Sequence, residues 1–160
     1  KNMYKWFIYF WLDNEDLFIN KISFEKEDFM NRIIIVEQKE DVLGNLNILY
    51  QKSQEKDKIS KIINNPKYIN LKVLLDYINK SDENREKFNR WVTGSAYSTS
   101  VIKIYINPDV RDLWDVSTCS AAIQVKSSKN NIKNINYNTL YSILLSLINS
   151  DLEKPKLTTE

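Results

Sequence analysis

Histidine is absent from the 160-residue chain, and cysteine and glycine are scarce. Without histidine, the chain can hold no Ser-His-Asp triad, no Cys-His dyad and no histidine-ligated metal. The single cysteine excludes an intrachain disulfide and a cysteine-cluster zinc site. The two glycines, Gly44 and Gly94, are too few for a glycine-rich phosphate loop. These absences weigh against nucleotide chemistry, metal-dependent hydrolysis and histidine-dependent proteolysis, and we expect neither a metal nor a cofactor.

Net charge and hydropathy argue against two kinds of partner, nucleic acid and membrane. The formal net charge is +2 at pH 7, which argues against a nucleic-acid surface. No signal peptide is evident, and the apolar stretch at residues 6–12 is too short to cross a bilayer, so we expect no membrane partner. The chain begins at Lys1 and is expected to be a piece of a longer protein. A lone thiol is typical of a reducing, cytosol-like compartment.

The first 93 residues are predicted to be mainly helical. Ser23 is expected to cap a helix that starts near Glu25. The β-branched residues 33–36 are compatible with a short strand instead. Residues 64–66, Asn-Asn-Pro, are expected to interrupt the helical pattern. A helical stripe follows it, made of Leu71, Leu74, Leu75 and Ile78.

A well-delimited helix is predicted after Ser81, which is a suitable N-cap. Gly94 is placed to take the left-handed position after its last turn. Phe88 and Trp91 are expected to face the core. Beyond Gly94, residues 101–106 and 121–126 predict strands, and residues 111–118 predict a loop that leads to the cysteine.

The last helix is expected to be capped by Asn138. Its apolar face comprises Leu140, Ile143, Leu144, Leu147 and Ile148. The predicted fold class is α+β, a mostly helical N-terminal part followed by a small β-sheet packed with helices. We expect a helical segment at 1–80, a core lobe at 81–150 and a flexible tail at 151–160.

Cys119 is the residue best suited to chemistry. Its flanks, Ser117, Thr118 and Ser120, are small and polar, so they leave the thiol accessible. A thiol is a competent nucleophile without histidine, because a few per cent is thiolate at neutral pH. It also suits reversible thioester exchange. The competing interpretation is a buried cysteine that only fills space.

Four segments, in order, resemble the catalytic C-lobe of HECT-type ubiquitin ligases. Residues 87–95, KFNRWVTGS, resemble the family's F-L-R-F-V-T-G-S. Residues 112–119, DLWDVSTC, resemble D-R-L-P-x-A-H-T-C, with Thr118 and Cys119 on the family's Thr-Cys pair. Residues 123–126 fall where L-D-L-P follows the cysteine, and residues 137–148 resemble Y-x-x-L-x-x-x-L-L-x-A-I. The resemblance covers about residues 82–149.

Several positions depart from the family pattern. Its histidine before Thr-Cys is Ser117 here, and its proline is Trp114. The interval between Thr-Gly-Ser and Thr-Cys is shorter, and the aromatic residue near the eukaryotic C-terminus has no counterpart. These departures, with the longer helical segment in front, are more like the HECT-like effectors that pathogenic bacteria secrete into host cells.

The resemblance implies that Cys119 takes ubiquitin from a conjugating enzyme as a thioester and passes it to a substrate lysine. The conjugating enzyme would bind an N-lobe that precedes Lys1. Thr118 would support the thioester carbonyl. Asp115 is a candidate acceptor for the lysine proton, although a solvated loop carboxylate is the alternative. Trp114 is expected either to cover the thiol or to pack across the loop base. The competing function is a non-enzymatic helical interaction domain with a buried structural cysteine.

Overall fold

The computed structural model describes residues 22–38, 47–51, 59–60, 63–128 and 136–154. The apolar stretch at residues 6–12 and the last six residues of the expected tail lie outside these ranges. These ranges contain five strands and six helical elements.

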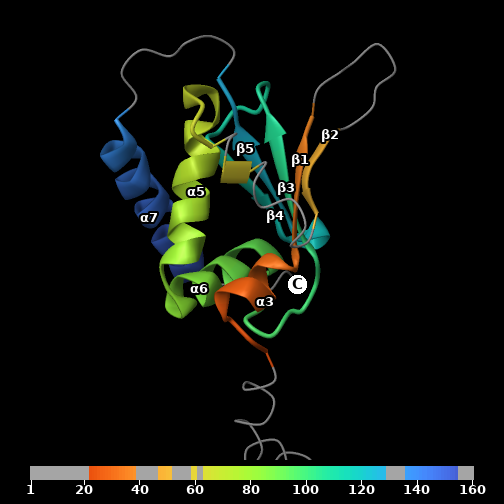
Figure 1. Cartoon of the computed structure of the whole chain (residues 1–160). Helices are drawn as coiled ribbons and strands as arrows, with labels where there is room; N and C mark the ends of the chain where they lie inside the picture. The colour runs from red at the N-terminus through yellow and green to blue at the C-terminus, as the bar shows by residue number, and fades with distance from the viewer. Residues whose placement is uncertain (1–21, 39–46, 52–58, 61–62, 129–135, 155–160) are drawn as a thin grey trace, which may run out of the picture.

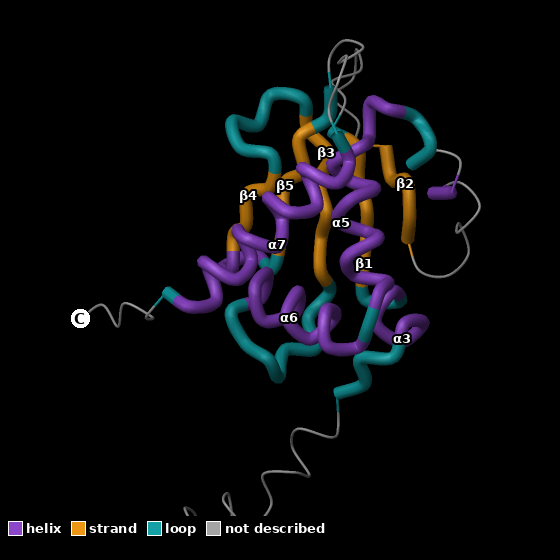
Figure 2. Tube along the Cα trace, turned by 90° about the vertical axis from the view of Figure 1, so that its left-hand side faces the viewer, coloured by secondary structure: helices purple, strands orange, loops and turns teal. Residues whose placement is uncertain are grey.

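A five-stranded mixed sheet forms the centre of the molecule, in the order β2-β1-β3-β5-β4. Its three central strands run parallel to one another, and the outer strands β2 and β4 run antiparallel to their neighbours. Figure 2 shows this order across the sheet. The strands are β1 (Ile33–Glu37), β2 (Asn47–Gln51), β3 (Ile102–Asn107), β4 (Trp114–Ser117) and β5 (Ala122–Lys126).

Helices cover one face of this sheet. The long helices α5 and α7 lie along it, and α6 crosses its lower end in Figures 1 and 2. No described helix covers the opposite face (Figure 1). The helical elements are α3 (Lys26–Met30), η2 (Pro66–Tyr68), α5 (Ile69–Lys80), α6 (Asp82–Thr93), η3 (Thr118–Ser120) and α7 (Tyr137–Glu153).

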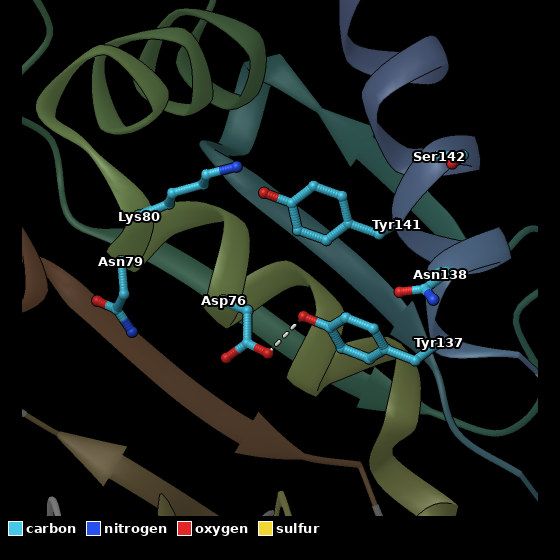
Figure 3. Close-up of a pocket in the computed structure, with 7 residues that line it drawn as sticks. All are labelled: Asp76, Asn79, Lys80, Tyr137, Asn138, Tyr141 and Ser142. Carbon is cyan, nitrogen blue, oxygen red and sulfur yellow. Dashed lines mark hydrogen bonds between the residues drawn. The ribbon is translucent and has the colours of Figure 1, made fainter.

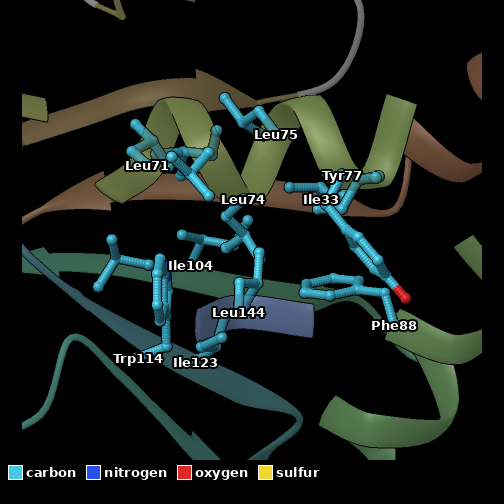
Figure 4. Close-up of a cluster of buried hydrophobic side chains, with 14 of the residues drawn as sticks. Ile33, Leu71, Leu74, Leu75, Tyr77, Phe88, Ile104, Trp114, Ile123 and Leu144 are labelled. Carbon is cyan, nitrogen blue, oxygen red and sulfur yellow. The ribbon is translucent and has the colours of Figure 1, made fainter. Parts of the chain in front are cut away.

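Strand alternation explains why the core lies on the helix side. Along β3, Ile102, Ile104 and Ile106 are buried, whereas the residues between them are half-buried. The register places Ile104 beside Ile35 of β1 and Ile123 of β5 on the same face. Buried residues of the helices pack onto these isoleucines, as Figure 4 shows. The result is one continuous hydrophobic core between the sheet and the helices.

The predicted α+β class is confirmed, since a small sheet packs with helices. The predicted limits of α6 are also confirmed. The Ser81 hydroxyl accepts a hydrogen bond from the Asn84 N–H at 3.1 Å. Gly94 has a φ of 81° and donates its N–H to the Arg90 carbonyl at 2.9 Å.

The N-terminal half is mainly helical in its described residues, as predicted, but it also supplies two strands to the sheet. Residues 33–37 form β1, so the strand interpretation of this run is correct. β2 adds a second strand before residue 80. Because β1 pairs with β3, the sheet and core extend across the expected boundary between residues 80 and 81. The helix after Ser23 begins at Lys26, and Glu25 occupies its N-cap.

Four predictions in the C-terminal half are wrong in detail. The expected loop at 111–118 contains β4, where Trp114 and Val116 alternate with polar residues. Asn136, not Asn138, caps α7, and its side chain accepts the Asn138 N–H at 2.9 Å. Ile143 is 44% exposed, so it does not belong to the buried face of α7. The helix also continues to Glu153, into the expected tail.

Candidate functional site

Cys119 lies at the tip of the connection between the antiparallel strands β4 and β5. It is the middle residue of η3, and its thiol is free and exposed. The turn closes when the Ala121 N–H donates to the Thr118 carbonyl at 3.3 Å. Ala121 takes a left-handed conformation, with a φ of 49°, which redirects the chain into β5. The expected accessibility of Cys119 is therefore confirmed, and the buried cysteine of the competing interpretation is wrong.

The thiol-bearing turn lies at the same end of the sheet as the starts of the three parallel strands. The carbonyl of Arg32, just before β1, accepts the Ile102 N–H of β3 at 2.8 Å. The carbonyl of Ala121, just before β5, accepts the Lys103 N–H at 3.1 Å. These bonds tie the segment before β1, the start of β3 and the Cys119 turn to one another.

Thr118 lies against the end of α6. A Cβ placed on Gly94 would be 3.6 Å from the Thr118 Cβ, an ordinary van der Waals distance. The structure thus brings together the Thr-Gly-Ser and Thr-Cys segments, which are separate in sequence. A groove of about 530 Å³ runs beside this contact. It is lined by Arg90, Trp91, Gly94, Ser95, Ala96, Tyr97, Val116, Thr118, Asp151, Leu152 and Lys154.

One wall of this groove carries a carboxylate at the end of α7. The Asp151 carboxylate accepts the indole N–H of Trp91 at 2.8 Å. It also forms an ion pair with Lys154, with an N···O distance of 3.3 Å. The first contact joins the last turn of α7 to α6, and the ion pair lies within the C-terminal end of α7. No local sequence pattern predicts the bond between Trp91 and Asp151, because it depends on how the two helices pack.

Asp115 and Trp114 occupy opposite faces of β4. Trp114 is buried at 3% exposure, and its indole N–H donates to the Asn70 carbonyl at 3.1 Å. Packing at the base of the turn is therefore its role, and it does not cover the thiol. Asp115 is exposed and pairs with Gln124 on the face that no described helix covers. The role of Asp115 as a proton acceptor stays a prediction, because it rests on proximity to Cys119 in sequence.

Behind the groove, a polar cluster formed by Arg32 and Asn89 holds the loop at 95–100. The Arg32 guanidinium donates to the Asn89 side-chain carbonyl at 2.8 Å. Burial lowers the pKa of Arg32 from its ordinary value. The ring of Phe29, with its centroid 5.3 Å from the guanidinium carbon, provides a second favourable contact for the charge. Sequence reasoning missed both residues of this cluster.

A second pocket, of about 570 Å³, lies between α5 and α7 (Figure 3). The Tyr137 hydroxyl donates to the Asp76 carboxylate at 2.6 Å. Burial, this hydrogen bond and the charge of Asp76 raise the pKa of Tyr137, and burial and Asp76 also raise that of Tyr141. Both phenols are therefore neutral at physiological pH and cannot act as bases there. The Lys80 ammonium lies 5.7 Å from the centre of the Tyr141 ring, so a cation and an aromatic ring face each other in this pocket.

Among the described residues, no group of three or more histidine, cysteine, aspartate or glutamate side chains could hold a metal ion. Within the same ranges, no helix is long and apolar enough to span a membrane. Comparisons with protein-family models, curated proteins and solved structures found no match to the chain. The resemblance to the HECT-type catalytic lobe therefore stays a prediction.

Proposed function

We propose that the chain is the catalytic lobe of a HECT-type ubiquitin ligase and acts through Cys119. The observation that carries this proposal is the exposed thiol on a turn whose Thr118 lies against Gly94. Two segments that resemble the family's motifs thus meet in space beside the only thiol of the chain. If the two resemblances were accidental, nothing would require the Thr-Gly-Ser and Thr-Cys segments to lie close together in space.

The reaction consists of two acyl transfers. The Cys119 thiolate attacks the carbonyl carbon of the thioester that joins ubiquitin to a conjugating enzyme. A new carbon–sulfur bond forms, and the sulfur of the conjugating enzyme leaves as a thiolate. A substrate lysine then attacks the Cys119 thioester, an isopeptide bond forms, and Cys119 leaves as a thiolate. The attacking amine loses its proton in this second step.

The edge of β4 supports binding of the extended tail of ubiquitin. β4 is the outer strand of the sheet on this side, and it leads directly to the turn that carries Cys119. The Lys126 N–H of β5 donates to the Leu113 carbonyl at 2.9 Å. Because alternate residues of an antiparallel strand bond the same neighbour, Trp114 and Val116 direct their backbone groups to the outer edge. An extended peptide that pairs with this edge would run toward the thiol.

Two residues beside Cys119 have proposed supporting roles. Thr118 is exposed next to the thiol, and its hydroxyl or N–H would donate to the thioester carbonyl. Asp115 would accept the lysine proton, since its carboxylate is exposed to solvent on β4. An Asp115→Asn variant should load ubiquitin normally and slow only the transfer to lysine.

The proposed partners are ubiquitin, a conjugating enzyme that binds a preceding N-lobe, and lysines of substrate proteins. The proposed place of action is a reducing, cytosol-like compartment, reached by secretion into a host cell if the protein is a bacterial effector. The non-enzymatic interaction domain is the other candidate. It predicts that Cys119 can be replaced without loss of function.

The experiment uses the proposed longer ligase, in which an N-lobe precedes this chain, together with activating enzyme, conjugating enzyme and ubiquitin. Wild type should give an adduct on a non-reducing gel that disappears with a thiol reductant. Cys119→Ala should give neither the adduct nor chains. Ser120→Ala, a matched change in the same turn, should retain both. Equal chain formation by Cys119→Ala and wild type would refute the proposal.

A further inference from the structure

We propose that Arg32 and Asn89 are positioning residues for the Cys119 reaction, because they fix the loop at residues 95–100 beside the Thr118–Cys119 turn. This inference rests on the proposed function. It assigns a role to Arg32, which lies outside the segments that resemble the ligase family.

The loop at 95–100 is held mainly through its backbone carbonyls. It follows α6 and precedes β3 without regular structure of its own. The side-chain amide of Asn89 donates to the carbonyls of Ser95, Ala96 and Ser98, at 3.4, 3.3 and 3.2 Å. Asn89 is fully buried, with an exposure of 0%. Losing this amide would take the side-chain donor from the Ala96 carbonyl and one of two side-chain donors from each of the Ser95 and Ser98 carbonyls.

Arg32 holds the far half of the same loop. One terminal nitrogen of its guanidinium donates to the Ser98 carbonyl at 2.8 Å and to the Ser100 carbonyl at 3.0 Å. Its Nε donates to the Ser100 carbonyl at 3.2 Å. The same side chain donates to Asn89, so the two residues act together. A lysine cannot reproduce this arrangement, because its ammonium lacks the fixed planar fork of donors.

The position of the loop matters because the loop forms part of the groove that Thr118, the residue before Cys119, also lines. Ser95, Ala96 and Tyr97 line that groove with Thr118. The hydroxyl of Thr93 also donates to the Ser95 carbonyl, at 2.9 Å, and fixes the start of the loop against α6. A shift of the loop would therefore change the wall of the groove at Thr118, the residue next to the thioester-bearing Cys119. Misplacement of this kind, away from the reacting atoms, slows chemistry by changing the approach of the reactants.

The test measures single-turnover transfer in the longer protein, with ubiquitin preloaded on Cys119 and free lysine as the acceptor. Arg32→Ala should slow the transfer by up to roughly 100-fold, with far-UV circular dichroism unchanged. Guanidinium ion at millimolar concentration should restore part of the rate, because it can occupy the vacated site. Methylammonium should not. Arg111→Ala, which removes an exposed arginine from the connection between β3 and β4, is the matched control and should keep the wild-type rate.

A second readout separates positioning from loss of fold. Amide hydrogen exchange at residues 95–100 should accelerate in Arg32→Ala and in Asn89→Ala, while exchange in α7 stays at the wild-type rate. If Arg32→Ala does not fold, Arg32→Lys keeps the charge and carries the same expectation. A wild-type transfer rate in a folded Arg32 variant would overturn the inference and leave the proposed function standing. If wild type forms no Cys119 adduct, the proposed function fails, and the inference fails with it.

Discussion

Replacing Leu144 with alanine should strongly destabilise the fold. Leu144 has an exposure of 0% and lies in the middle of the core between α7 and the sheet (Figure 4). Burying a leucine side chain contributes about 1.5–3 kcal/mol, and the cavity left by truncation adds to the loss. We therefore expect the free energy of unfolding to fall by about 2–5 kcal/mol. For a chain of this size, a loss near 3 kcal/mol lowers the melting temperature by roughly 6–12 °C.

The neighbouring Leu145 gives a matched control on the same helix. It is 37% exposed, so Leu145→Ala should cost less than about 1 kcal/mol. Urea unfolding followed by circular dichroism at 222 nm measures both variants. Equal losses of stability in the two variants would show that α7 does not pack through the face that contains Leu144. Leu144→Asp should prevent folding, because it places an unpaired charge in the core.

Three further perturbations test other parts of the fold. Gly94→Ala should cost about 1–2 kcal/mol through its left-handed backbone alone, since the new Cβ would meet Thr118 at an ordinary 3.6 Å. Ser81→Ala should cost about 1 kcal/mol by removing the cap of α6, whereas Ser142→Ala on the exposed side of α7 should be close to neutral in urea unfolding. Burial, followed by the charges of nearby groups, raises the pKa of Tyr77 from 10.0 to about 12. Because the folded state favours the neutral phenol, Tyr77 contributes stability that is complete below pH 10. That stability is lost as the pH rises toward 12, by about 1 kcal/mol per pH unit. Tyr77→Phe should reduce the alkaline slope by that amount in a pH series of unfolding curves, and an unchanged slope would contradict the assignment.

Sequence signals were sufficient where the determining contacts are local. Ser81 and Gly94 delimit α6 through hydrogen bonds within a few residues, so their residue types alone predict its ends. The apolar spacing of α7 likewise predicts its buried side, since Leu140, Leu144 and Ile148 are all buried. The exposure of Cys119 follows from a short turn with small polar flanks.

Local patterns left the elements that depend on distant partners ambiguous. The run at 33–37 becomes a strand because it pairs in parallel with β3, far along the chain. β4 has only four residues, although the alternation of Trp114 and Val116 with Asp115 and Ser117 could have indicated it. The bond between Arg32 and Asn89 joins residues 57 positions apart, and no local pattern predicts it.

The most direct test of the central claim is to trap ubiquitin on residue 119. In the longer protein, Cys119→Ser should accept ubiquitin as an oxygen ester, since the serine hydroxyl occupies the place of the thiol. The adduct should survive thiol reductant, be cleaved by hydroxide, and map to residue 119 by peptide mass spectrometry. Amines attack oxygen esters less readily than thioesters, so this variant should build no chains. An ubiquitin ester mapped to another residue, or chains built by Cys119→Ser at the wild-type rate, would contradict the account.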